Sequence, residues 1–143
     1  MKREEILAKL PYSSPFLFVD SIQKIDENGV VGTYYYDENL FFYKGHFVGH
    51  PVTPGVILTE TMAQIGVVCL GIFILNDNFT KDSVIALISS EIDFLNPVFP
   101  NETVTVFSEK MYFRFGKLKC KVWMENQKKE TVCRGYIAGM IKY

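Results

Sequence analysis

The chain has 143 residues, of which 48% are hydrophobic, and a formal net charge of −1. A chain of this length can bury one hydrophobic core, so we expect a single domain over 1–143. The near-zero net charge argues against general nucleic-acid binding.

In chain order, the first predicted element is a short amphipathic helix over 3–10, which Pro11 ends. Residues 54–75 form a long apolar helix that starts at Pro54, because a proline in the first helical turn loses no hydrogen bond. The other elements read as strands bounded by turn residues, and the last two alternate in part between polar and apolar residues. These strands are 16–25, 30–36, 83–94, 102–115, 117–125 and 131–141.

One long apolar helix among five or six antiparallel strands indicates an α+β fold, in which a twisted sheet wraps the helix. Helix 54–75 is nearly long enough to span a membrane, but the carboxylate of Glu60 would be costly in lipid. We therefore expect no membrane span and a helix buried by its own protein. The sheet alone covers such a helix incompletely, so we expect a homodimer that protects the sheet edges.

The cysteines and the N-terminal segment indicate the cellular compartment in which the protein works. Cys69, Cys120 and Cys133 are odd in number and lack metal-ligand spacing. They indicate buried, reduced thiols of a cytoplasmic protein and no metal site. The N-terminal segment MKREEILAKLPY carries charge but no apolar stretch, so we expect no signal peptide.

The segment 42–64, FYKGHFVGHPVTPGVILTETMAQ, combines His46 in a Gly-, Pro- and aromatic-rich loop with Glu60 in the apolar helix. Alone, a histidine after a glycine is more often structural. However, a histidine can titrate near neutral pH, and burial raises the pKa of a carboxylic acid. The N–H groups at the helix start can polarise a carbonyl oxygen, and Gly55 has no side chain to block a substrate. This set suits removal of a proton next to a carbonyl and loss of a β substituent.

The stretch GHFVGHPVTPGVILTETMAQ resembles the signature GHFPGxPxxPGVLxxEAMAQ of the β-hydroxyacyl-acyl-carrier-protein dehydratases of fatty-acid synthesis. Residues 10–20 and 93–100 also resemble that family's LPHRxPFLLVD and FxxPVxPGD segments. The resemblance covers about residues 10–105 and implies a hot-dog fold. Tyr12 replaces a histidine of the pattern, Val48 a proline and Thr61 an alanine. These differences bear on substrate range and on carrier-protein docking.

The resemblance implies that His46 and Glu60 are catalytic and act across a dimer interface, with a trimer of dimers as a further option. The implied substrate is a (3R)-hydroxyacyl chain on the phosphopantetheine of acyl carrier protein, with no other cofactor. His46 would take the C2 proton, and Glu60 would protonate the departing C3 hydroxyl to give a trans-2-enoyl thioester. Gln64 fits a residue that orients Glu60 and equally a helix-packing residue. The expected substrate-binding residues are Gly55, Val56, Val48, Gln64, Phe94 and Pro97.

Two alternatives stay open, a hot-dog acyl thioesterase and a non-catalytic acyl-thioester binding protein. The histidine counts against hydrolysis, which needs no base so placed, and a binding protein would leave both acid and base unexplained. Residues 105–134 carry eight Lys/Arg against three Asp/Glu. This basic region, including Arg114 and Lys117, is a candidate docking face for an acidic carrier protein, or a solvated strand face.

Overall fold

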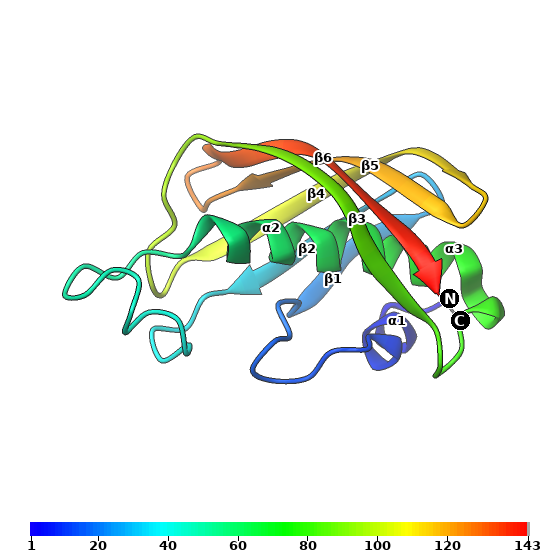
Figure 1. Cartoon of the computed structure of the whole chain (residues 1–143), viewed down its shortest axis with the longest axis horizontal. Helices are drawn as coiled ribbons and strands as arrows, with labels where there is room; N and C mark the ends of the chain where they lie inside the picture. Colours follow the sequence, from blue (N-terminus) through cyan, green and yellow to red (C-terminus); the bar gives the residue numbers. More distant parts are fainter. Residues whose placement is uncertain (143) are drawn as a thin grey trace.

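The largest element of the fold is its sheet. The computed structural model describes residues 1–142, whose six strands form one antiparallel sheet in the order β1-β2-β4-β5-β6-β3. Figure 1 shows the sheet curving over a central helix, which confirms the predicted α+β architecture. The strands are β1 (Ser21–Asp26), β2 (Gly29–Tyr35), β3 (Val84–Phe94), β4 (Thr103–Arg114), β5 (Lys117–Glu125) and β6 (Thr131–Lys142).

The central helix consists of α2 (Gly55–Ala63), a π-helical turn over 64–69 and α3 (Leu70–Leu75). The sequence predicted an uninterrupted α-helix, and π turns of this kind are rare and concentrate at functional sites. The Gly66 carbonyl of this turn accepts a hydrogen bond from the buried Ser108 hydroxyl of β4 at 2.8 Å. In the most apolar 18-residue window of the helix, 78% is buried inside the protein. The helix is therefore the core helix of the fold.

Alternating side chains of the strands supply the other half of the core. Burying a Val, Leu or Met side chain contributes about 1.5–3 kcal/mol each, so the inward row of one strand contributes several kcal/mol to folding. Cys120 belongs to such a row and, like Cys69 and Cys133, is a free, buried thiol as predicted. One core cluster runs from α1 to β6; Tyr143, the last residue of the predicted domain, lies outside the described residues. The inward row of β5 is Leu118, Cys120, Val122 and Met124.

The strand predicted over 16–25 is wrong in its first half, because β1 begins only at Ser21. Between the short helix α1 (Arg3–Lys9) and β1, the backbone bonds a side chain of the central helix instead of a neighbouring strand. The Phe18 N–H donates to Gln64 Oε1 at 2.8 Å, and Gln64 Nε2 donates to the Phe16 carbonyl at 3.1 Å. Residues 16–18 are therefore fixed to the helix.

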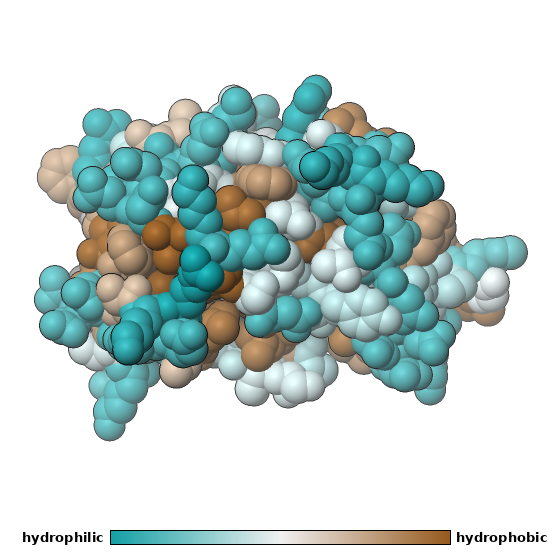
Figure 2. Space-filling view, turned by 180° about the vertical axis from the view of Figure 1, so that it is seen from behind, coloured by the Kyte–Doolittle hydropathy of each residue, from teal (hydrophilic) through white to brown (hydrophobic). Residues whose placement is uncertain are grey.

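Strand β3 forms one edge of the sheet and exposes apolar side chains. Leu87, Ile88 and Phe94 are each about half exposed. In Figure 1 this strand crosses the front of the molecule, whereas the back, seen in Figure 2, is mainly hydrophilic with apolar residues gathered toward one side. Although the strand also exposes Ser89, Ser90, Glu91 and Asp93, a long unpaired edge with large apolar side chains is a candidate surface for pairing with another chain.

Candidate active site

His46 lies in the loop 37–54, which leads from β2 to the central helix. Its Nδ1 atom is 2.9 Å from the Val52 carbonyl oxygen. Because a carbonyl oxygen only accepts, Nδ1 carries the hydrogen and donates it, which leaves Nε2 of the neutral ring as a proton acceptor. The Val52 N–H donates back to the His46 carbonyl at 2.8 Å. The loop thus presents His46 in the form that a general base needs.

The N-terminus of α2 shares a cavity with His46. This cavity has a volume of about 390 Å³, and His46, Gly55, Phe94 and Pro97 are among its lining residues. The Thr53 N–H, just before the helix, donates to the Val98 carbonyl at 2.8 Å and so fixes the loop to the segment after β3. Four of the sequence-predicted site residues therefore come together at one end of the helix.

The first turn of α2 offers backbone N–H groups to this cavity. The Ile57 N–H donates to the Pro54 carbonyl at 2.9 Å, so the N–H groups of Gly55 and Val56 precede the first helical hydrogen bond. They carry the positive end of the helix dipole. A Cβ atom at Gly55 would lie 3.1 Å from the Phe94 ring. The space that the sequence analysis left open for a substrate at Gly55 is therefore partly filled by Phe94.

Glu60 lines a second cavity of about 260 Å³. Its side chain is half-buried, and burial raises the pKa of the carboxyl, while the hydrogen bond from Gln64 opposes that rise. Among the residues that the structure describes, the lining contains one other polar side chain, that of Tyr12. The remaining lining residues are Phe16, Ala63, Val67, Val68, Ile85, Leu87, Ile137 and Gly139. The cavity suits an apolar chain next to a protonated acid.

Gln64 makes the hydrogen bond to Glu60 that the sequence analysis considered. Its Nε2 donates to Glu60 Oε2 at 2.9 Å. The amide itself is fully buried and is held by the backbone of Phe16 and Phe18. Because Oε2 accepts from Gln64, the other carboxyl oxygen is the one that a proton can occupy when Glu60 is uncharged. Gln64 thus serves both as a packing residue and as a partner of Glu60.

Within one chain, His46 and Glu60 line separate cavities. Val48 and Val56, two of the expected substrate-binding residues, are 83% and 76% exposed and line neither cavity. The expected site is therefore divided between two regions of the chain. This division is compatible with a site that two chains complete together.

Sequence reasoning missed two polar features near the site. Tyr36 and Thr61 are fully buried, and their hydroxyl oxygens are 2.6 Å apart. Since the Thr61 hydroxyl donates to the Ile57 carbonyl at 2.9 Å, Tyr36 donates to Thr61. The threonine that departs from the family pattern thus has a partner just after β2. The second missed feature is Tyr12, which the sequence shows only as a departure from the family pattern and which lines the same cavity as Glu60.

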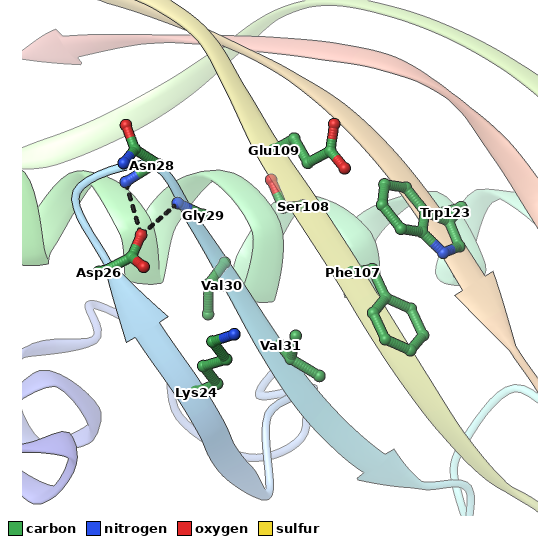
Figure 3. Close-up of a pocket in the computed structure, with 10 residues that line it drawn as sticks. All are labelled: Lys24, Asp26, Asn28, Gly29, Val30, Val31, Phe107, Ser108, Glu109 and Trp123. Atoms are coloured by element: carbon green, nitrogen blue, oxygen red, sulfur yellow. Dashed lines mark hydrogen bonds between the residues drawn. The ribbon is translucent and has the colours of Figure 1, made fainter.

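A third hollow, of about 300 Å³, lies on the outer face of the sheet and is drawn in Figure 3. Phe107 and Trp123 stack there with ring centroids 5.3 Å apart, next to the β1–β2 turn that Asp26 stabilises by accepting from the Asn28 and Gly29 N–H groups. None of the predicted site residues lines it. Among residues 1–142, no group of three or more His, Cys, Asp or Glu side chains is arranged to hold a metal ion.

Sequence similarity to known proteins shows which family this chain belongs to. Residues 10–138 match the FabA-like domain, and the chain belongs to this family, which confirms the predicted resemblance. A relative from Thermus thermophilus, named 3-hydroxyacyl-[acyl-carrier-protein] dehydratase FabZ, is 31% identical over 140 residues, 96% of each chain. Relatives of the same name from Fusobacterium nucleatum and Herpetosiphon aurantiacus are 34% and 36% identical; each match covers 85% of this chain and 86% of the relative.

Solved structures support the fold. The dehydratase heterocomplex ApeI:P from Xenorhabdus doucetiae matches 96% of this chain and 91% of its own, with a TM-score of 0.78 and 12% identity. A hypothetical thioesterase from Streptococcus pneumoniae, solved with coenzyme A, matches 85% of this chain and 84% of its own, with a TM-score of 0.64 and 16% identity. At these identities the likeness shows the fold alone, and it confirms the hot-dog fold.

The environment of Glu60 predicts an effect on stability. Because burial raises its folded-state pKa above the ordinary value of 4.5, the native state loses stability as pH rises from about 4.5 through that pKa. Glu60→Gln keeps an oxygen that accepts from Gln64 but cannot ionise. Its Tm should therefore exceed that of the wild type at pH 7–8, with the difference vanishing near pH 4. Thermal unfolding from pH 4 to 8 measures this, and a difference independent of pH would contradict the buried-acid assignment.

Proposed function

We propose that this protein is a 3-hydroxyacyl-[acyl-carrier-protein] dehydratase. It removes water from a (3R)-hydroxyacyl thioester on acyl carrier protein and releases the trans-2-enoyl thioester, in fatty-acid or related acyl-chain synthesis. The observation that carries the proposal is the pair formed by an imidazole whose Nε2 accepts a proton and a carboxyl whose pKa burial raises. The names of relatives over 30% identical along most of the chain support the substrate class.

The active unit is a homodimer, because His46 and Glu60 line separate cavities of one chain. The apolar edge of β3, together with the exposed Val48 and Val56, supplies a surface for a second copy. In this dimer, His46 of one subunit faces the partner's Glu60. A trimer of such dimers is compatible with the same interface. As a soluble protein with a sheathed helix, it works in the cytoplasm beside its carrier protein.

In the reaction, His46 Nε2 takes the C2 proton of the substrate while the C3–O bond breaks. Protonated Glu60 donates its proton to the departing hydroxyl, so water leaves and a C2–C3 double bond forms. The Gly55 N–H, at the positive end of α2, hydrogen-bonds the thioester oxygen as negative charge develops there. Loss of one such donor typically costs about 3 kcal/mol in barrier. The protein's own residues carry each step, and the substrate brings its phosphopantetheine.

The two cavities divide the substrate. Phe94 and Pro97 line the space beside His46 and the helix terminus, where the thioester would lie. The apolar cavity of Glu60 would hold the acyl chain beyond C3. Val48 and Val56 are exposed in one chain and would contact the pantetheine or the partner at the entrance. A glutamate at position 60, where a related dehydratase–isomerase family has aspartate, favours dehydration without isomerisation.

Direct assay tests this function. Purified protein incubated with a 3-hydroxyacyl carrier protein should produce enoyl absorbance, and His46→Ala and Glu60→Gln should each lower kcat by at least about 10²-fold. His50→Ala is the matched control, since His50 is exposed on the same loop. Free thiol without enoyl product would establish a thioesterase instead. Tight binding of the thioester with no turnover would establish a binding protein.

Mixing the two inactive variants tests the shared site. A dimer of one His46→Ala subunit and one Glu60→Gln subunit contains one site with both groups intact. If subunits exchange at random, about half of the dimers are mixed and about one quarter of wild-type activity returns. A site built within one chain would stay inactive in every mixture. Refolding the variants together and separately, followed by the same assay, distinguishes these outcomes.

The basic strip around Tyr112 is the proposed docking face for the carrier protein. The Arg114 guanidinium lies 4.4 Å from the Tyr112 ring centroid, and Lys117 Nζ lies 5.7 Å from it. The hydrogen bond from Lys117 and the charges of Lys117, Lys119 and Arg114 lower the pKa of Tyr112. None of these basic residues is paired across the sheet with a carboxylate, since their partners are each other, Tyr112, Met140 and Ala138.

Charge reversal should weaken this docking. Arg114→Glu with Lys117→Glu is expected to raise the Kd for acyl carrier protein by about tenfold at low salt and to flatten its salt dependence. Lys24→Glu with Lys128→Glu changes the net charge equally at exposed positions outside the strip and should leave the Kd unchanged. Isothermal titration at low and at physiological salt measures both. Equal effects of the two double variants would show that only net charge matters.

A further inference from the structure

We propose that Tyr12 is a second hydrogen-bond donor to the hydroxyl that leaves the substrate, acting beside Glu60. This inference rests on the proposed dehydration and names a residue that contacts the reacting oxygen. Tyr12 and Glu60 line the same cavity, whose other lining side chains are all apolar. Among the described residues 1–142, a hydroxyl group entering this cavity therefore meets two polar side chains.

The fold holds Tyr12 in place through Gln64. The buried amide of Gln64 bonds the backbone of Phe16 and Phe18, and it does so from the helix that carries Glu60. Phe18 is fully buried and packs edge-on against the Phe16 ring, with centroids 5.0 Å apart. The Phe16 N–H also donates to the Ser13 carbonyl at 2.8 Å, which closes a turn next to Tyr12. The segment 10–18 is thus anchored over the helix face that presents Glu60.

The chemistry of Tyr12 suits a permanent donor. Burial raises the pKa of its phenol, and the negative charge of Glu60 and then Cys69 raises it further. The phenol therefore keeps its hydrogen across the whole pH range in which an imidazole and a carboxylic acid exchange protons. Once a bound acyl chain fills the cavity, this O–H would be costly to leave without an acceptor. A hydroxyl oxygen of a bound substrate supplies that acceptor.

The two donors each bind a different lone pair of the leaving oxygen. Glu60 Oε2 already accepts from Gln64, so the proton on the other carboxyl oxygen faces the substrate. As the C3–O bond breaks, the electron pair moves to the oxygen, which takes the proton of Glu60 and leaves as water. Tyr12 donates a hydrogen bond to the same oxygen and retains its own proton. The balance of the dehydration is unchanged, while the charge that develops on the oxygen is shared between two donors.

The test compares Tyr12→Phe, Tyr12→His and the wild type in the enoyl assay. Tyr12→Phe keeps the ring that closes the cavity and removes only the hydroxyl, so kcat should fall about tenfold with KM changed less than about twofold. Tyr12→His restores an N–H donor at this position and should recover part of kcat. Tyr136→Phe, on the exposed outer face of the sheet, is the matched control and should leave both constants unchanged.

Thermal unfolding of each variant separates this role from a structural one. A folded Tyr12→Phe protein with wild-type kcat would overturn the role of Tyr12 and leave the proposed function standing. So would a loss that appears only in KM, or one that Tyr12→His does not relieve. If Tyr12→Phe fails to fold, Tyr12→Leu against Tyr12→His still decides, since a higher kcat for Tyr12→His supports the donor and equal kcat of the two variants opposes it. A wild-type protein that forms no enoyl product would overturn both proposals.

Discussion

One buried amide connects the parts of this molecule on which the site depends. Gln64 uses both of its N–H groups, one toward the Phe16 carbonyl and one toward Glu60, while its oxygen accepts from the Phe18 N–H. A buried amide group left without a partner costs about 1–3 kcal/mol, so the three bonds constrain one another. The Gln64 side chain therefore supplies the hydrogen bonds that the backbone before β1 would otherwise make within the sheet. It also orients the carboxyl of Glu60. Stability of the N-terminal segment and geometry of the acid are coupled through this residue.

The apolar lining of the Glu60 cavity serves two purposes at once. Apolar walls favour the binding of an alkyl chain and also favour the uncharged form of the carboxyl. Tyr12 in the same cavity shows the same effect, since burial raises the pKa of its phenol as well. The energetic cost of ionising Glu60 in the native state thus accompanies its proposed role as an acid that keeps its proton. Stability and acidity are in opposition at this position, which is a common feature of catalytic carboxyls.

Much of the fold and of the candidate site followed from the sequence because the signals were local. Local spacing and residue type predict the start of α2 at Pro54-Gly55, the inward row of β5 and the apolar helix. The strand expected at 16–20 failed because a distant side chain, Gln64, supplies the backbone bonds that a strand partner would. The π turn at 64–69 has no local signal, since its Gly66 carbonyl is satisfied by Ser108 from β4. Tyr12 beside Glu60 is likewise a contact between segments far apart in sequence.

The separation of the proposed acid and the proposed base within the chain has a physical rationale. An acid that stays protonated needs a dry cavity, whereas a base that accepts a proton needs its ring nitrogen open toward the substrate. Glu60 lies five residues beyond Gly55, roughly 7.5 Å along the helix axis, so one helix cannot present both environments at its N-terminus. Placing His46 on a loop and Glu60 in the helix interior satisfies each requirement separately. In the proposed dimer, association at the exposed β3 edge buries apolar surface and also completes the active site. Dissociation would therefore abolish turnover without unfolding either chain.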